Sequence, residues 1–197
     1  MPAAREALLD AALAAVARLP WSAVRMVDVA ADARVSRQTL YNEFGSKDGL
    51  ARALLRREAD AYLAGVARRL AGPAAMPDRL AGTAEWIVAE ARDRPLLRAL
   101  LTGCWGGRLP APRPARTGTQ GSGVPAQRRA DAGPPTPGEL IAATLVCVDV
   151  RWAGTCELTV RLALSHLLAA DPRGVGGLVR GALGGRLSAP NPTAGGR

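Results

Sequence analysis

Apolar side chains recur at helical spacing through most of the chain, and this pattern predicts a succession of α-helices. In the first part of the sequence it predicts helices over residues 4–19, 26–33, 37–44 and about 47–70. Pro20 ends the first of these, and Ser36 is a suitable N-cap for the third. Gly45 can end the third helix because glycine tolerates positive φ, and Ser46 can cap the fourth. Strand-like alternation is not convincing anywhere, so we expect an all-α fold.

Further along the chain, apolar periodicity alternates with segments that are poor in large apolar side chains. Helices are predicted near residues 77–92, 95–104 and 175–183, and structure is expected to resume over 139–152 and 156–169. Residues 106–138 are rich in Pro, Gly, Arg, Thr and Ser, which predicts a long mobile loop. The pattern therefore predicts an N-terminal domain over 1–48, a helical domain over 49–187 and a disordered tail over 188–197.

The first three predicted helices are short, and the turn before the third is tight, which is the pattern of a helix-turn-helix. Val35, Leu40 and Phe44 can anchor the inner face of the third helix. Its other face carries the polar groups that base edges and phosphates require. We expect DNA contacts from Arg37, Gln38, Thr39, Tyr41, Asn42 and Lys47.

These residues offer different chemistry to DNA. Arg37 can bridge guanine O6 and N7, and Gln38 can bridge adenine N6 and N7. Thr39 and Tyr41 carry hydroxyls for phosphates. Lys47 is the single lysine of the chain, and it falls in the first turn of the fourth helix, where free backbone N–H groups favour an anion.

Charge is distributed unevenly along the chain. The net charge of +9 is typical of a protein with a polyanionic partner. Residues 1–50, however, carry six basic and six acidic side chains. The excess lies mainly in residues 51–70 and 105–137. The assignment of DNA contacts therefore depends on where individual side chains stand and not on the net charge.

The chain has three cysteines, Cys104, Cys147 and Cys156, without the spacing of a metal site. An odd number of cysteines suits a reducing compartment. Residues 1–19 lack the apolar core of a signal peptide, and the longest apolar run is too short to span a bilayer. We expect a cytoplasmic protein with no cofactor, no metal and no membrane contact. A thiol-dependent hydrolase that pairs Cys104 or Cys156 with His166 is the enzymatic alternative, although no motif surrounds these residues.

The stretch "VDVAADARVSRQTLYNEFGSKDGL" resembles the N-terminal motif of the TetR (TetR/AcrR) family of bacterial transcriptional regulators, and the resemblance extends over about residues 5–55. It implies phosphate contacts from Thr39, Tyr41 and Lys47, and base readout by Arg37, Gln38 and Asn42. In two places the chain departs from the motif. Arg34 replaces the usual turn glycine, which predicts either a left-handed or otherwise strained backbone or a slightly different turn. Arg25 replaces the usual capping threonine, although its charge can still reach a phosphate, and Ser36 keeps the place of the motif's serine at the turn. Arg25 and Ser36 are therefore further candidate DNA contacts.

The resemblance also implies a C-terminal all-α domain that forms a homodimer and usually holds a small-molecule pocket. The expected function is that of a repressor that binds a palindromic operator and is released by an apolar or amphipathic ligand. An alternative is a regulator controlled by a protein partner. The candidate ligand-binding residues are Trp86, Leu97, Leu101, Trp105 and Cys147, and the candidate dimer residues are Leu158, Leu162 and His166. Residues 158–168 are apolar on more than one face, which predicts burial against both their own domain and a partner.

Overall fold

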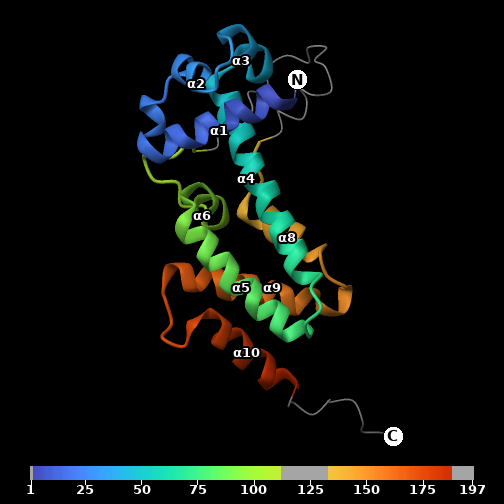
Figure 1. Ribbon diagram of the computed structural model, residues 1–197. Coiled ribbons are helices and arrows are strands. Elements are labelled where there is room, and N and C mark those ends of the chain that lie inside the picture. The colour runs from blue at the N-terminus through green and yellow to red at the C-terminus, as the bar shows by residue number, and fades with distance from the viewer. Residues whose placement is uncertain (1, 112–132, 188–197) are drawn as a thin grey trace, which may run out of the picture. The chain divides into compact units, whose positions relative to one another are not determined.

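The computed structural model describes residues 2–111 and 133–187, and every regular element within these ranges is a helix (Figure 1). The described chain forms two compact units. The first unit comprises Met1–Tyr62 and Pro95–Pro137, and the second comprises Leu63–Arg94 and Gly138–Arg197. The long helix α4 (Lys47–Leu70) contributes to both. The expected all-α fold is confirmed, whereas the functional boundary expected at residue 48 stays a prediction.

The first unit contains the N-terminal helices, the first part of α4 and one later helix. Its elements are α1 (Pro2–Arg18), the 3-10 turn η1 (Trp21–Ala23), α2 (Met26–Asp32), α3 (Arg37–Phe44), α4 as far as Tyr62 and α6 (Pro95–Thr102). Helix α1 packs against α2 and α3, and α2 packs against α3. The side chains that these helices bury include Leu8, Ala12, Val29, Leu40 and Phe44.

The turns around α3 follow the local signals of the sequence. Ser36 caps α3, since its Oγ accepts a hydrogen bond from the backbone N–H of Thr39 at 3.0 Å. Gly45 follows α3 with φ of 70°, and Arg34 has φ of 55°. The left-handed backbone predicted at Arg34 is therefore confirmed, and so is the helix end at Gly45.

A close approach between α3 and α4 fixes the angle at which the two helices meet. Ser46 caps α4 by accepting from the backbone N–H of Gly49 at 3.1 Å. A Cβ atom at Gly49 would lie 1.8 Å from the backbone oxygen of Phe44. Only glycine fits there without a shift of the backbone, so Gly49 is needed for this junction.

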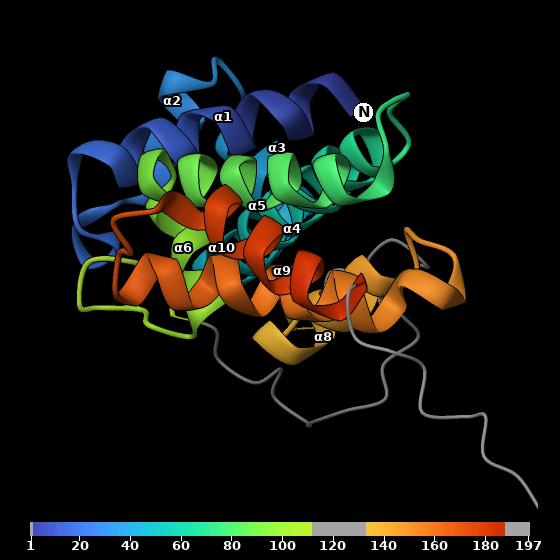
Figure 2. The ribbon, with the colours of Figure 1, turned by 90° about the horizontal axis from the view of Figure 1, so that it is seen from below.

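The second unit contains α5 (Met76–Asp93), most of α8 (Pro137–Leu145), α9 (Val150–Leu168) and α10 (Gly174–Leu187). Helix α5 packs against both α9 and α10, and these two also pack against each other (Figure 2). The apolar segment 139–152 is divided between α8 and α9 by a turn. Asp149 is the N-cap of α9, and its carboxylate accepts from the backbone N–H of Arg151 at 3.0 Å.

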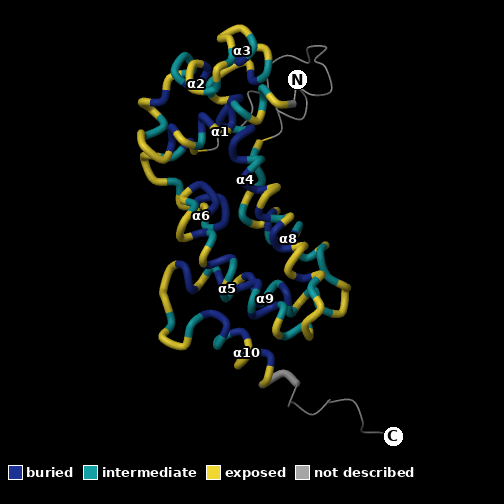
Figure 3. Tube along the Cα trace, in the orientation of Figure 1, coloured by how far each residue is buried: buried dark blue, intermediate teal, exposed yellow. Residues whose placement is uncertain are grey.

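Helix α9 is not buried on all sides within one chain (Figure 3). Leu158 and Leu162 are half-buried, and Leu168 is 70% exposed. Val146, in the turn before α9, and Val150, the first residue of α9, are also exposed. The all-round burial expected for residues 158–168 is therefore not complete within a single chain.

Most of the loop expected over 106–138 and the whole tail over 188–197 lie outside the described residues. Of the loop residues that the structure describes, 106–111 and 133–136 are not helical, whereas 137 and 138 already belong to α8, so the predicted loop is two residues too long. Within the described ranges, no helix combines the length and the apolarity that a membrane crossing requires.

Candidate nucleic-acid interface

Helix α3 presents two chemically different faces. Leu40 and Phe44 are buried. Arg37, Gln38 and Asn42 are exposed, and Tyr41 is exposed despite its aromatic ring. The polar residues predicted on one face of this helix therefore do share a solvent-facing surface, and the apolar anchors face the core.

Hydrogen bonds already order part of this exposed face. Gln38 Nε2 donates to Asn42 Oδ1 at 2.9 Å, one helical turn away. This contact uses only one of the two amide hydrogens of Gln38, so its other hydrogen and its carbonyl oxygen are left for a base edge. The Thr39 hydroxyl lies 2.9 Å from Ser36 Oγ, which ties it to the N-cap.

Several basic side chains of the first unit are paired with carboxylates. Arg18 lies 3.5 Å from Asp32, and Arg25 makes two hydrogen bonds to Asp28, at 2.7 and 2.9 Å. The hydrogen bonds that Arg25 donates to Asp28, and the negative charge of that carboxylate, raise the pKa of Arg25. Arg25 is the N-cap residue of α2 but makes no side-chain cap. Its guanidinium is neutralised locally, so a phosphate would have to compete with Asp28 for it.

Arg34 and Arg37 flank the N-cap of α3, and both are exposed. Within the described part of the chain, neither guanidinium has a hydrogen-bond or ion-pair partner. The equal numbers of acidic and basic side chains in residues 1–50 therefore do not mean that every charge in this segment is paired. Arg5, Arg18 and Arg25 are paired with carboxylates, Lys47 contacts a backbone oxygen and a tryptophan ring, and the two unpaired guanidinium groups lie at the start of α3.

Lys47 begins α4, and its ammonium is directed towards η1. The Nζ atom donates to the backbone oxygen of Ser22 at 3.2 Å and lies 5.1 Å from the centre of the Trp21 ring. Burial lowers the pKa of Lys47, with a smaller opposing effect from Asp48. Nothing in the local sequence could have indicated the Trp21 contact, because the two residues are far apart along the chain.

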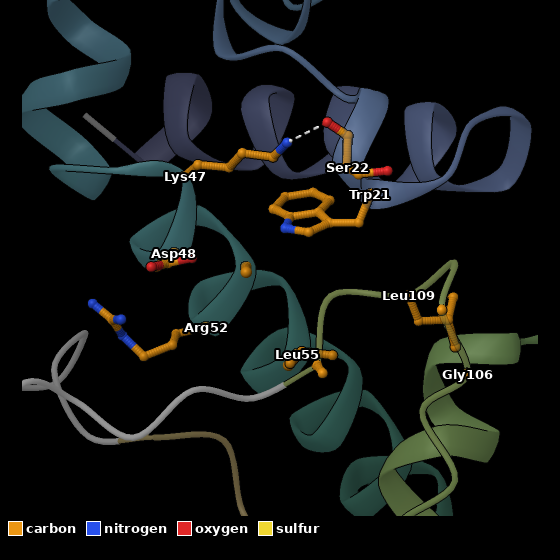
Figure 4. Close-up of a pocket in the computed structure, with 11 residues that line it drawn as sticks. Trp21, Ser22, Lys47, Asp48, Arg52, Leu55, Gly106 and Leu109 are labelled. Atoms are coloured by element: carbon orange, nitrogen blue, oxygen red, sulfur yellow. Dashed lines mark hydrogen bonds between the residues drawn. The ribbon is translucent and has the colours of Figure 1, made fainter.

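A cavity of about 370 Å³ lies next to Lys47 within the first unit (Figure 4). Three segments form its walls: η1, the first turns of α4 and residues 106–111. The backbone N–H of Trp21 donates to the oxygen of Arg108 at 2.7 Å, which ties the first wall to the third. Lys47 therefore belongs both to the start of α4 and to the cavity.

The residues predicted to bind a ligand are divided between the two units, and none of them lines this cavity. Leu97 and Leu101 are buried on α6, and Trp105 is half-buried beyond it. In the second unit, Trp86 packs over Gly65 with the Arg69 guanidinium 4.9 Å from its ring, and Cys147 lies in the turn after α8. Their assignment as ligand contacts stays a prediction.

The thiols and the histidine differ in burial and in the unit to which they belong. Cys104 is exposed in the first unit, whereas Cys156 and His166 are buried on α9. Ten positions along a helix correspond to about 15 Å, so Cys156 and His166 cannot share a proton. Burial, and secondarily Cys147, raises the pKa of Cys156 to about 11. His166 Nδ1 accepts from the backbone N–H of Asp171 at 3.2 Å, which gives it a structural role. The described residues also contain no metal-binding cluster of His, Cys, Asp or Glu side chains.

The first three helices, the tight turn before α3 and the polar face of α3 together define a helix-turn-helix domain of the DNA-binding class. Residues 8–54 match the sequence profile described as bacterial regulatory proteins, tetR family. Residues 8–54 therefore carry a segment that is similar to the DNA-binding region of the TetR family.

Two relatives extend this comparison. The HTH-type transcriptional regulator AlkX of Mycobacterium tuberculosis is 38% identical over 100 residues, which are 50% of this chain and 47% of that protein. The chain thus matches about half of the length of this curated relative. The crystal structure of the TetR family repressor AlkX from Dietzia sp., a protein implicated in biodegradation of n-alkanes, superimposes with a TM-score of 0.54. The superposition covers 92% of this chain and 94% of the Dietzia protein, and the two sequences are 21% identical over it. The two proteins therefore share the fold.

Proposed function

We propose that the chain is a transcriptional regulator that binds double-stranded DNA through α3. The observation that carries this proposal is the exposed, polar face of α3, whose opposite face is anchored by Leu40 and Phe44. Arg37 and Gln38 stand at the N-terminal end, where recognition helices meet base edges. Asn42 lies one turn further along and orients Gln38.

Phosphate contacts complete the proposed interface. Thr39, Tyr41 and Ser36 supply hydroxyls, and Arg34, Arg25 and Lys47 supply positive charge. Arg34 and Arg37 have the least competition for a phosphate, since both are exposed and have no partner among the described residues. Lys47 has to turn away from Ser22 to reach DNA, and Arg25 has to leave Asp28.

The regulator is proposed to act as a homodimer on a palindromic operator. Two recognition helices then read half-sites about 34 Å apart, one turn of DNA. The incomplete burial of α9 supports this, with the half-buried Leu158 and Leu162 as the proposed contact. His166, the third candidate, is already buried within its own chain.

Its proposed role is that of a repressor released by a small apolar or amphipathic ligand. Such a ligand has to bind the form that cannot hold DNA more tightly than the form that can, otherwise it shifts nothing. The runner-up is a helix-turn-helix regulator controlled by a protein partner. The two differ in whether small molecules alone release DNA.

The test is selection of DNA from a random pool, followed by affinity measurements over a range of salt concentrations. Tyr41→Ala should weaken binding to every sequence, and Lys47→Ala should also lower the slope of log affinity against log salt by about one phosphate contact. Arg92→Ala, an exposed arginine of α5, is the matched control and should leave both quantities unchanged. Specific binding that survived both substitutions at physiological salt would remove these residues from the interface.

Base readout needs a separate measurement. Arg37→Ala and Gln38→Ala should each relax selection at particular base pairs, by about 1–3 kcal/mol. The selection is repeated with each variant. An unchanged sequence preference would exclude that residue from base readout.

A further inference from the structure

The cavity beside Lys47 combines an apolar floor with a charged rim. Leu55 and Ala51 form buried parts of the wall, and Trp21 and Leu109 are half-buried. The rim carries two cations and one carboxylate, from Lys47, Arg52 and Asp48, so one positive charge is in excess. A volume of about 370 Å³ is within the range of small-molecule sites in proteins.

The position of the Lys47 ammonium is the second feature that points to a ligand. Its contacts are the Ser22 carbonyl and the face of the Trp21 ring, and no carboxylate lies within ion-pair distance in the described part of the chain. A partly desolvated ammonium without an ionic partner would gain from an anion. Burial lowers the pKa of Lys47, which agrees with this gain.

We propose that this cavity is a binding site for a small amphipathic monoanion. The anionic group pairs with Lys47 at the rim, and the apolar body lies against Trp21, Leu55 and Leu109 (Figure 4). A single negative charge matches the single positive excess of the rim. A ring or a short chain suits the apolar floor, and a carboxylate is the simplest such anion.

The site has a regulatory consequence that rests on the proposed function. Lys47 cannot pair with the ligand and with a DNA phosphate at the same time. Ligand and DNA then oppose each other, and the linkage is reciprocal, so each lowers the affinity for the other by the same factor. The ligand acts from within the DNA-binding unit, at a place separate from the residues predicted to bind an effector.

Binding is tested first without DNA, by calorimetry on the full-length protein. The probes are β-naphthoate and nonanoate, each compared with its neutral primary amide. We expect at least one carboxylate to bind saturably. Its amide should bind at least about tenfold more weakly, because a charge-assisted contact is lost. If neither carboxylate bound, or if an amide bound as tightly as its carboxylate, the proposal would be overturned.

Two variants locate the site. At Gly107 a Cβ atom would meet nothing within 4 Å, so Gly107→Leu should fill part of the cavity without disturbing the fold. Ala51→Met fills it from the α4 side. Both should weaken carboxylate binding roughly tenfold or more, whereas Gly138→Leu, at an equally open glycine outside the cavity, should not. Undiminished binding to both cavity variants would place the ligand elsewhere.

The regulatory part is tested with the selected operator. The bound carboxylate should weaken DNA binding of the wild type and should have no such effect on Lys47→Gln. A wild-type protein that bound carboxylate without any loss of DNA affinity would overturn the competition. Failure to bind any DNA would overturn the proposed function instead, and the calorimetric result would still decide the site.

Discussion

Arg34 is the residue whose conformation is least expected from its chemistry. Its φ of 55° is in the left-handed region, which costs a side chain with a Cβ atom about 1–2 kcal/mol. The neighbouring turn holds it there, because its N–H bonds to Ala31 and the N–H of Val35 bonds to Ala30. The strained backbone at Arg34 therefore places a guanidinium that has no partner among the described residues in solvent beside α3.

The first prediction concerns this residue. Arg34→Gly should leave the free energy of unfolding unchanged or raise it by up to about 1 kcal/mol, since relief of strain is partly offset by the chain entropy of glycine. The same variant should weaken DNA binding and lower the salt slope by about one contact. Urea unfolding and binding titrations measure the two effects. Arg34→Lys is the control, because it keeps the positive charge and should keep the salt slope. If the wild type and Arg34→Gly bound DNA with equal affinity, Arg34 would not contact a phosphate.

The second prediction separates the cysteines. At pH 8, iodoacetamide should modify exposed Cys104 first, while Cys156 should stay unmodified in the folded protein. The pKa of Cys156 is raised to about 11 by burial, and the thiolate is the reacting form. Mass spectrometry of the digested protein follows each site, with a urea-unfolded sample as control. Rapid native modification of Cys156 would indicate an activated thiol and would revive the enzymatic alternative.

At the scale of elements, the junction between α3 and α4 controls how the recognition helix is presented. The two helices are linked by Gly45 and Ser46 alone, and Gly49 lies against the last carbonyl of α3. A backbone oxygen cannot swing aside as a side chain can. A change at this junction should therefore alter both stability and the orientation of α3.

The third prediction tests this junction. Gly49→Ala should lower the free energy of unfolding by about 1–3 kcal/mol, because its Cβ would lie 1.8 Å from the Phe44 oxygen. Gly82→Ala on α5 is the matched control, since a Cβ there meets nothing within 4 Å. That control should stabilise the protein by up to about 1 kcal/mol through helix propensity. Thermal or urea unfolding compares the two, and equal effects would mean that the α3–α4 contact is easily relieved.

The elements themselves were largely predictable, because their signals are local. Ser36 and Gly45 mark the ends of α3, and the predicted range 37–44 agrees with the observed helix. Contacts between distant parts of the chain were not predictable in this way. The Trp21–Lys47 contact, the Gly49–Phe44 approach and the cavity depend on how helices pack, which apolar periodicity does not encode. The left-handed Arg34 is an exception, because its strain followed from a single departure from a family motif.

At the scale of the whole molecule, the net charge of +9 is a poor guide to the interface. Within residues 1–50, pairing decides which charges are available. Arg18 and Arg25 are matched by Asp32 and Asp28, whereas Arg34 and Arg37 are not matched within the described chain. If α3 binds DNA as proposed, electrostatic steering depends on a few unpaired side chains near that helix.

The fourth prediction concerns assembly. Leu162→Arg should convert a dimer to monomers, because a charge would be buried in the proposed α9 contact. Light scattering measures the mass, and circular dichroism checks that the variant remains folded. Val146→Arg, at an exposed apolar position before α9, is the control and should remain dimeric. A folded Leu162→Arg protein that stays dimeric would move the interface to another surface.

The strained arginine also has a consequence for how this sequence can evolve. Every arginine codon becomes a glycine codon by a single change at its first base, so the relaxed turn is always one mutation away. Such a mutation is expected to cost nothing in folding, which leaves DNA binding as the pressure that can retain Arg34. In cells grown without need for the regulator, position 34 should therefore be among the first in this domain to drift to glycine.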